Sequence, residues 1–259
     1  MRPLTDNTPK PLLPVRGQPL LLWHVQALVA GGFTQLVFNT AWLGTKITSF
    51  FDAFRSIDGE FKLSMMVDSP PAATFHAQFS AEQTDFGGAL ETAGGIARAL
   101  PLLGAQHPPQ PQDVFWVVAG DVFVPGFVFT QASVDRFRAS THLAHLWLVP
   151  NPPHNPLGDF GLSDAGLALN LPKQSTPLAD SPAPAHVPRY TYSTIGLYRA
   201  ELFSPPWCDI AHGNPAGIKA PLAPLLRKAM DAGRVSAELY TGPWTDVGTP
   251  ERLAQLNTP

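Results

Sequence analysis

The sequence predicts an α/β protein built on a mostly parallel sheet, and three observations lead to this class. Amphipathic stretches alternate with short apolar runs through the first part of the chain, which is the order of a parallel sheet with helical crossovers. The run Val114–Ala119 contains no polar residue, as is typical of a strand buried on both faces. Hydrophobic residues make up 44% of the 259 residues and charged residues only 14%, so a large core can form.

Apolar residues that recur every three or four positions predict the helices. The stripe from Leu21 to Val29 belongs to the first helix, which the pair Gly31-Gly32 ends. Thr249 as N-cap and Pro250 as the first helical residue begin the last helix. We expect helices over residues 19–30, 43–54, 94–103, 129–139, 221–232 and 249–256.

Short runs of apolar and β-branched residues between turn signals predict the strands. We expect strands over residues 35–39, 61–67, 114–119, 143–149, 190–198 and 235–240. Residues 69–88 have weak periodicity and many Pro, Ala and polar residues, and residues 172–188 are rich in Pro and Ser. Both stretches are therefore expected to be irregular insertions in a single domain that spans residues 1–259.

The composition argues against several classes of function. A net charge of −3 leaves no broad basic surface for a nucleic acid. Cys208 is the only cysteine, which excludes a disulfide framework or a cysteine-based zinc site and favours a reducing cytosol. The apolar stretch Val114–Phe129 is interrupted by Asp121 and by Pro125-Gly126, so it predicts a strand and a turn. We expect a cytoplasmic protein with neither a nucleic acid nor a membrane as its partner.

Three charged side chains lie where a ligand could bind. Lys10 lies between two prolines that restrict the backbone around it, and the alternative is a solvated lysine in a rigid loop. Asp121 directly follows the strand Val114–Ala119, and ligands of open α/β sheets bind beyond such strand ends. Asp246 lies at a second strand end, before the last helix. Two such carboxylates can position one Mg²⁺ against a triphosphate, whereas the alternative for each is a turn-forming aspartate.

The segment Leu90–Ile96 contains small residues before an expected helix. Such residues let a backbone approach a ligand closely, and the free N–H groups of the helix terminus then face it. The segment matches neither the G-x-x-x-x-G-K-[ST] pattern of a P-loop nor the G-x-G-x-x-G pattern of a dinucleotide site. As a bare Gly-Gly pair it would predict only a turn.

In their order along the chain, these segments resemble the sugar-1-phosphate nucleotidyltransferases, or NDP-sugar pyrophosphorylases. The matching segments are Arg2–Thr5, Thr8–Val15, Asn39–Gly44, Leu90–Ile96, Gly120–Asp121, Gly158–Phe160 and Trp244–Arg252. The resemblance covers nearly the whole chain and implies a Rossmann-like three-layer sandwich of the nucleotide-diphospho-sugar transferase type. Asn39–Gly44 and Leu90–Gly95 are most similar to the N-acetylmuramate α-1-phosphate uridylyltransferases. The alternative is the mannose-1-phosphate guanylyltransferases, which show L-G-T-A-G at the second of these segments.

The resemblance implies a reaction in which a sugar 1-phosphate attacks the α-phosphorus of an NTP and pyrophosphate leaves. The favoured substrates are UTP and N-acetylmuramate α-1-phosphate. By the same resemblance, Lys10 binds the reacting phosphate, Asp121 and Asp246 hold Mg²⁺, and the backbone of Thr92–Gly95 contacts the nucleobase. The expected substrate-binding residues are Arg2, Asn39, Glu91, Thr92, Ala93, Gly94, Gly95, Asn151, Asp159 and Lys219. The oligomeric state, monomer or homo-oligomer, stays open.

One departure from the family pattern concerns the N-terminus. The family's first strand and its G-x-G-x-R loop have no counterpart in the sequence, and we expect in-frame codons upstream of Met1 to encode them. A chain without these elements would be a catalytically impaired relative that binds a sugar nucleotide or a partner protein. Two other enzyme classes are disfavoured. Asp121-Val122-Phe123 lacks the D-x-D of α/β glycosyltransferases, and the G-x-S-x-G elbow of serine hydrolases does not occur.

Overall fold

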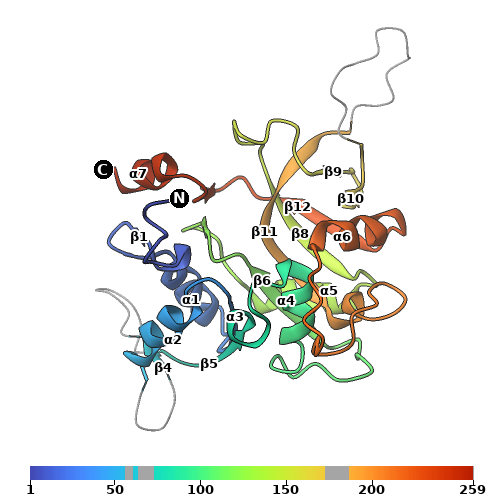
Figure 1. The fold of residues 1–259 in the computed structure, drawn as a ribbon. Coiled ribbons are helices and arrows are strands. Elements are labelled where there is room, and N and C mark those ends of the chain that lie inside the picture. The colour runs from blue at the N-terminus through green and yellow to red at the C-terminus, as the bar shows by residue number, and fades with distance from the viewer. Residues whose placement is uncertain (56–60, 64–72, 173–186, 259) are drawn as a thin grey trace.

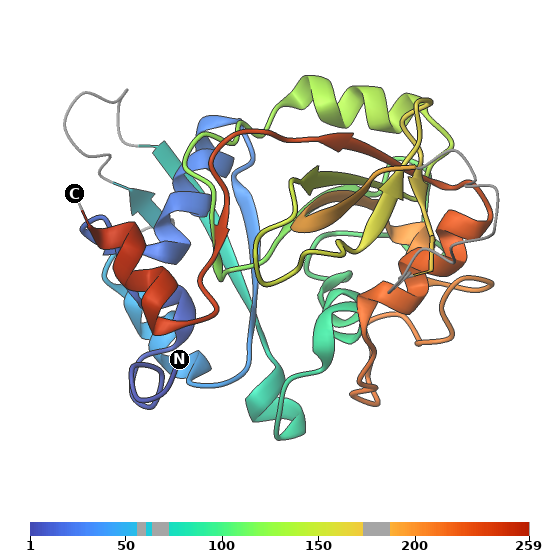
Figure 2. The ribbon, with the colours of Figure 1, turned by 90° about the horizontal axis from the view of Figure 1, so that it is seen from above.

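The computed structural model describes residues 1–55, 61–63, 73–172 and 187–258 (Figure 1). Its main strands form a larger sheet around the long strand β11 and a smaller sheet around β5. Figure 2, a view from above, shows these two sheets side by side with helices packed around them. The larger sheet contains β6 (Val114–Val118), β8 (Ala144–Val149), β9 (Phe160–Leu162), β10 (Ala168–Leu169), β11 (Arg189–Arg199) and β12 (Val235–Leu239).

The long strand β11 runs against its neighbours in the larger sheet. It pairs with β8 along one edge, and with β6 and the short β9 along the other. β6 and β8 are both antiparallel to β11, while β12 is parallel to β8. β6, β8 and β12 therefore point the same way. The predicted α/β class with a mostly parallel sheet is confirmed, and β11 is its reversed strand.

The smaller sheet contains β3 (Gln35–Thr40), β4 (Phe61–Leu63) and β5 (Ala73–Ala81), followed by helix α3 (Glu82–Phe86). β5 is parallel to β3 and antiparallel to β4. The expectation of an irregular insertion over residues 69–88 is wrong from Ala73 onward. Phe75, Ala77 and Phe79 alternate along β5 and pack with Phe51 in one apolar cluster, which is the two-residue period of a half-buried strand.

Parts of three expected segments lie outside the described residues. These parts are residues 64–67 of the strand expected over 61–67, residues 69–72 of the first insertion, and residues 173–186 of the second. Between β8 and β11, the described residues add the short strands β9 and β10 to the edge of the larger sheet.

All six expected helices are present. The helices are α1 (Leu20–Ala30), α2 (Gly44–Asp52), α4 (Glu91–Ala99), α5 (Gln131–Ala139), α6 (Leu222–Asp231) and α7 (Pro250–Asn257), in addition to α3. α4 begins at Glu91 instead of Gly94, so most of the segment Leu90–Ile96 lies within the helix and not before it. The predicted cap of α7 is confirmed, because the Thr249 hydroxyl accepts from the Arg252 amide. None of the helices in the described part of the chain has the length and apolar character that a membrane crossing requires.

β6 is less buried than the sequence predicts for a central strand. All five of its residues, Val114–Val118, are only half-buried. Among the described residues, β6 pairs only with β11 and β3 pairs only with β5, so the two sheets share no ladder hydrogen bonds. An unpaired edge leaves the backbone and flanking side chains of a strand accessible. This edge explains why a run without polar residues is not fully buried.

A small apolar cluster joins the two ends of the chain. Four short strands lie near it: β1 (Pro14–Val15), β2 (Gln18–Pro19), β7 (Val122–Phe123) and β13 (Thr245–Asp246). Its members come from β1 and the residue before it, the start of α1, β7, the residue after β13, and α7. The buried side chains of this terminal cluster are Leu13, Val15, Leu20, Phe123, Val247 and Leu253. Asn257 on α7 also accepts from the Arg16 amide at 2.7 Å and donates to the Pro14 carbonyl at 3.0 Å. Figure 1 and Figure 2 both show α7 beside the N-terminal segment.

Arg199, at the end of β11, is buried with only 3% of its surface exposed. The carbonyl groups that accept from its guanidinium are those of Pro111, Phe137, Arg138, Ser140 and His142. Three of these carbonyls belong to the last turn and C-cap of α5, where a cation also interacts favourably with the helix dipole. Burial lowers the pKa of Arg199, but a guanidinium remains protonated in proteins. One buried cation therefore fixes the end of α5 on the sheet.

We expect Arg199→Met to lower the free energy of unfolding by about 3 kcal/mol, because buried carbonyl groups lose their donor while most of the apolar stem is kept. Urea denaturation followed by circular dichroism measures this change. Arg136→Met, which replaces an exposed arginine of α5, is the matched control and should change stability by less than about 0.5 kcal/mol. Equal losses in the two variants would contradict the role given to Arg199.

Candidate active site

Lys10 and Asp121 form an ion pair between residues 111 positions apart in sequence. Lys10 Nζ donates to Asp121 Oδ2 at 2.9 Å. The lysine begins a short 3-10 helix, Lys10–Leu12, that lies against the end of β6. Gly120 permits this approach, because a methyl group on Gly120 would lie 3.2 Å from Pro11 Cγ. The glycine before Asp121 therefore lets the lysine turn lie close to the aspartate.

Asp246 lies beside Asp121 because two short strands pair at this point. β7 and β13 are antiparallel, and Asp246 is opposite Val122 in their register. The Val247 amide donates to the Asp121 carbonyl at 2.8 Å, which extends the pairing by one residue. Two aspartates that are 125 positions apart in sequence therefore occupy neighbouring positions on paired backbones.

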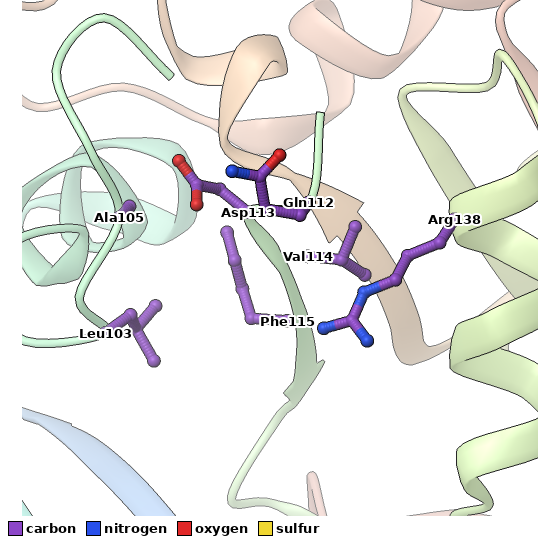
Figure 3. A pocket seen from close by; sticks show the side chains of 7 residues that line it. All are labelled: Leu103, Ala105, Gln112, Asp113, Val114, Phe115 and Arg138. Atoms are coloured by element: carbon purple, nitrogen blue, oxygen red, sulfur yellow. The ribbon is translucent and has the colours of Figure 1, made fainter. Parts of the chain in front are cut away.

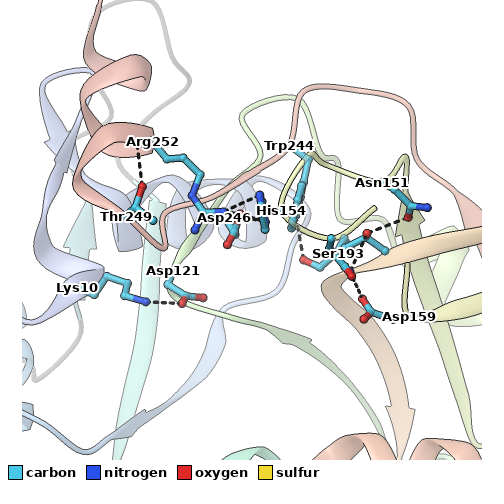
Figure 4. A network of polar contacts seen from close by, with 12 residues as sticks. Lys10, Asp121, Asn151, His154, Asp159, Ser193, Trp244, Asp246, Thr249 and Arg252 are labelled. Atoms are coloured by element: carbon cyan, nitrogen blue, oxygen red, sulfur yellow. Dashed lines mark hydrogen bonds and ion pairs between the residues drawn. The ribbon is translucent and has the colours of Figure 1, made fainter. Parts of the chain in front are cut away.

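Two cationic or polar side chains contact Asp246. Its Oδ1 accepts from Arg252 Nη1 at 2.7 Å and lies 2.9 Å from His154 Nε2. Arg252 comes from the first turn of α7, and His154 comes from the loop between β8 and β9. Figure 4 shows this group next to the Lys10–Asp121 pair. The site therefore combines residues from four separate parts of the chain.

Each aspartate uses one oxygen for its protein partners. Lys10 contacts Asp121 Oδ2, and Arg252 and His154 contact Asp246 Oδ1. Asp121 Oδ1 and Asp246 Oδ2 make no hydrogen bond or ion pair with any other described residue. The described residues also contain no group of three or more His, Cys, Asp or Glu side chains that could hold a metal ion. Two carboxylates without further ligands suit Mg²⁺, which takes its remaining ligands from phosphate oxygens and water.

The N-terminus of α4 is packed against the loop before α6. The amides of Ala93 and Gly94 donate to the Ala220 carbonyl at 2.9 and 3.1 Å. Ala93, Gly94 and Gly95 are buried, and a methyl group on Gly94 would lie 2.4 Å from the Ile218 carbonyl oxygen. The expectation that free amides of this segment face a ligand is therefore wrong for Ala93 and Gly94. Their small size and their N–H groups serve packing between α4 and the loop.

Glu91 and Thr92 remain exposed at the start of α4. Glu91 has a φ of 59°, in the left-handed region that disfavours residues other than glycine, and such strain is concentrated at functional sites. Lys219 lies beside the same segment, since a methyl group on Gly88 would be 3.7 Å from Lys219 Nζ. Three of the residues predicted to bind substrate are therefore gathered around this helix terminus.

Asn39, at the end of β3, meets Glu82, which follows β5, in front of Gly95. A methyl group on Gly95 would lie 2.5 Å from Glu82 Oε1 and 2.8 Å from Asn39 Nδ2. Glu82 is only 4% exposed, its Oε2 accepts from the Leu90 amide at 2.8 Å, and burial raises its pKa. Within the described residues, Glu82 Oε1 and the Asn39 amide group make no hydrogen bond. A carboxylate oxygen and an amide therefore converge here.

Asn151 and Asp159 build the loop between β8 and β9. Asn151 donates to two main-chain carbonyls and accepts from the Thr191 hydroxyl at 3.0 Å. Asp159 Oδ2 accepts from the Tyr192 amide at 2.9 Å and from Asn155 Nδ2 at 3.2 Å. Figure 4 shows both residues on the β11 side of Asp246, away from Lys10. Their contacts fasten the loop to β11.

Arg2 is not brought to these residues by any contact in the described chain. Its side chain is 83% exposed and pairs with Asp6 at 3.3 Å. Three other residues were missed in the sequence. Glu82 lies in a segment expected to be irregular, and His154 lies between the predicted residues Asn151 and Asp159. Arg252 lies in the first turn of the predicted helix that follows Asp246. A cation is unfavourable at the positive end of a helix dipole, so an arginine at this position indicates an acidic partner.

The pocket in Figure 3 lies at the other end of β6 from Asp121. Its volume is about 190 Å³. The lining residues are Leu103, Ala105, Gln112, Asp113, Val114, Phe115 and Arg138. At about 3.3 Å per strand residue, the stretch from Val114 to Asp121 separates the two places by roughly 20 Å. This pocket is therefore not part of the candidate active site.

Comparison with known proteins identifies relatives of this chain. The family model described as nucleotidyl transferase matches residues 1–258. The chain is 43% identical over 256 residues to the N-acetylmuramate alpha-1-phosphate uridylyltransferase of Neisseria meningitidis serogroup B, which covers 98% of this chain and 90% of that protein. It is 26% identical over 269 residues to the glucose-1-phosphate thymidylyltransferase of Streptomyces griseus, with coverage of 99% and 61%.

The fold has counterparts among solved structures. A Bacillus anthracis protein solved in complex with sucrose superposes with a TM-score of 0.65 at 18% identity, over 99% of this chain and 88% of that chain. HddC from Yersinia pseudotuberculosis, complexed with GMP-PN, gives a TM-score of 0.61 at 13% identity, over 99% and 92%. The resemblance found in the sequence is therefore confirmed: this chain belongs to the nucleotidyl transferase family and has the Rossmann-like fold of the NDP-sugar transferases.

Proposed function

We propose that this protein transfers the uridylyl group of UTP to N-acetylmuramate α-1-phosphate and releases pyrophosphate, a reaction of peptidoglycan sugar recycling. The observation that carries the proposal is the grouping of Lys10, Asp121 and Asp246 at the paired strands β7 and β13. The 43% identity to a Neisseria enzyme of that name supports the choice of substrates.

The proposed reaction is an in-line displacement at phosphorus. A phosphate oxygen of the sugar 1-phosphate forms a bond to the α-phosphorus of UTP, while the bond from that phosphorus to the bridging oxygen breaks and pyrophosphate leaves. Little covalent chemistry falls to the protein, so positioning and charge neutralisation dominate. Lys10 supplies a cation whose position is set by Asp121 and by two flanking prolines, and it binds the reacting phosphate.

We assign Asp121 Oδ1 and Asp246 Oδ2 as the carboxylate oxygens that hold Mg²⁺. The ion, when bound, neutralises charge on the triphosphate and the leaving pyrophosphate. Lys10 holds Asp121 by its other oxygen, and Arg252 and His154 hold Asp246 in the same way. These contacts fix the direction of both carboxylates before substrate binds, which limits the reorganisation needed during the reaction.

Glu82 and Asn39 support uracil as the base. Uracil presents one donor, N3–H, between two carbonyl acceptors. Glu82 Oε1 can accept from N3–H while Asn39 Nδ2 donates to an adjacent carbonyl oxygen. Guanine presents two adjacent donors, which a carboxylate binds with both of its oxygens. Because the Leu90 amide already contacts Glu82 Oε2, this arrangement favours UTP over GTP.

We further propose that the chain acts as one domain in the cytoplasm. Cys208, the only cysteine, is buried and free. A protein without disulfides suits a reducing compartment, which is where nucleoside triphosphates and sugar phosphates are also held.

The packing of α1 supports a single domain. This helix links the hydrophobic clusters of the two sheets, since Leu21 and Val25 pack in one of them and Ala27 packs against another.

The full-length protein should release pyrophosphate from UTP and N-acetylmuramate α-1-phosphate in the presence of MgCl₂, and EDTA should abolish the reaction. Asp121→Asn and Asp246→Asn should each lower kcat by about 10³-fold, because each removes a fixed charge that stabilises the transition state. A coupled pyrophosphate assay gives these rates. Asp135→Asn, at an exposed position of α5, is the matched control and should keep full activity.

Other outcomes of this assay separate the alternatives. Turnover with GTP and mannose 1-phosphate, but not with the uridine pair, would assign the chain to the guanylyltransferases. The absence of turnover with every pair, in protein that carries any in-frame upstream residues and still binds UTP in calorimetry, would identify a binding protein without catalysis.

Glu82→Gln tests the assignment of the base. The variant presents an amide N–H where uracil has its own N3–H, whereas cytosine has an acceptor at that position. We expect kcat/KM for UTP to fall by at least about 10-fold relative to that for CTP, since an unmatched buried donor costs about 1–3 kcal/mol. Glu201→Gln is the control, because it replaces a half-exposed glutamate that pairs with Arg234 and contacts neither Asn39 nor Leu90. An unchanged UTP-to-CTP ratio would remove Glu82 from base recognition.

A further inference from the structure

We propose that His154 is a positioning residue for the metal-binding carboxylate Asp246, and that it couples the loop between β8 and β9 to that carboxylate. This inference rests on the proposed function, because it assigns a role to a residue around the same reaction. It starts from one contact, His154 Nε2 at 2.9 Å from Asp246 Oδ1.

The loop that carries His154 is held firmly on β11. Asn155 Nδ2 donates to the Thr191 hydroxyl at 3.1 Å and to Asp159 Oδ2 at 3.2 Å. The Thr191 hydroxyl in turn donates to Asn151 Oδ1 at 3.0 Å. Arg189 adds donations to the carbonyls of three loop residues, Leu157, Gly158 and Asp159. A loop with this many anchors delivers its tip to a fixed point.

His154 stands at that tip and reaches a different part of the chain. Its ring contacts Asp246 on β13 and Arg252 on α7, 92 and 98 positions away in sequence. Both ring nitrogens lie 2.8 Å from Arg252 Nη1, and Nε2 alone also lies 2.9 Å from Asp246 Oδ1. Since Arg252 can only donate, the tautomer that suits both partners has Nδ1 as the acceptor and Nε2–H as the donor to Asp246. Among the described residues of this loop, only His154 hydrogen-bonds to Asp246 or Arg252.

The geometry around Asp246 shows what this contact does. Arg252 and His154 both contact Oδ1, and a methyl group on Gly248 would lie 2.2 Å from Arg252 Nη2 and 3.1 Å from Asp246 Oδ2. Gly248 therefore makes room for the arginine to reach the aspartate. With Oδ1 held from two sides, the carboxylate cannot rotate freely, and Oδ2 keeps one direction. Of the two side chains that hold Oδ1, His154 is the one that comes from the loop between β8 and β9.

Partners that orient a metal ligand affect metal affinity without touching the metal. Loss of such a partner typically costs about 10–100-fold in metal affinity or activity. The same contact also transmits the position of the loop between β8 and β9 to Asp246, so loosening the loop at its base should weaken metal binding through His154. Thr191 is the anchor best suited to this test, because its hydroxyl contacts two loop residues and none of Lys10, Asp121 and Asp246.

The first experiment measures binding of Mn²⁺, a spectroscopic probe for Mg²⁺, from the signal of free Mn²⁺ in electron paramagnetic resonance, on the protein with UTP. His154→Ala should raise the Kd for Mn²⁺ by about 10-fold or more. His154→Gln, whose Nε2 can occupy the place of the ring Nε2 and donate to Asp246, should recover most of the affinity. His107→Ala, which removes a histidine ring that stacks on His212, is the control and should not change the Kd. In turnover, His154→Ala should lower kcat while the KM for UTP changes less than about 3-fold.

The second experiment is a double-mutant cycle on the Kd for Mn²⁺. Thr191→Val should weaken Mn²⁺ binding in the parent protein but add little in the His154→Ala background, because the loop then has no contact with Asp246. Full additivity of the two changes would overturn the link through the loop, since independent sites add. An unchanged Kd in His154→Ala would overturn the positioning role itself. Both readouts need no turnover, so they stand if the parent protein binds Mn²⁺ and UTP yet fails to make a UDP-sugar.

Discussion

The site depends on the terminal cluster, the small apolar cluster that holds the first and the last residues of the chain together. Lys10 precedes the cluster residues Leu13 and Val15, while Asp246 lies directly before the cluster residue Val247. Asp121 is next to β7, whose Phe123 is buried in the same cluster. Burial of these side chains, at about 25 cal/mol for each Å² of apolar surface, therefore supplies the free energy that brings one cation and two carboxylates together. Without that burial, residues from opposite ends of the chain would not meet.

The carboxylates are brought together at an electrostatic cost, and the chain offsets it locally. Two adjacent aspartates repel each other, and each is paired with a cation through one oxygen, Lys10 for Asp121 and Arg252 for Asp246. This arrangement leaves the other two oxygens without a partner among the described residues. A divalent ion and a triphosphate carry opposite charges, so a site with nearly balanced charge can accept both together. Glu82 shows the same arrangement, because the Leu90 amide contacts one of its oxygens and the other makes no hydrogen bond within the described residues.

Local chemistry explains which features could be predicted from the sequence. The strand over Val114–Val118 and the cap at Thr249 depend on neighbouring residues, and both were identified correctly, although the strand is less buried than expected. β5 was missed because its alternation of Phe75, Ala77 and Phe79 follows a proline-rich stretch that obscures the period. The amides of Ala93 and Gly94 were misassigned because their acceptor, Ala220, lies more than 120 positions away. No local pattern reports a partner at that distance.

By itself, the sequence determined the family and the α/β class, and it predicted Lys10, Asp121 and Asp246 as site residues, because motif spacing and strand-end position are properties of short segments. Only the tertiary structure decided how those groups are held. It gave Asp246 the partners Arg252 and His154, and it turned the glycines of α4 from expected ligand contacts into packing positions. The physical reason is that orientation of a side chain is set by its nearest neighbours in space. In this site those neighbours include residues far away in sequence, as Lys10 is from Asp121 and His154 is from Asp246.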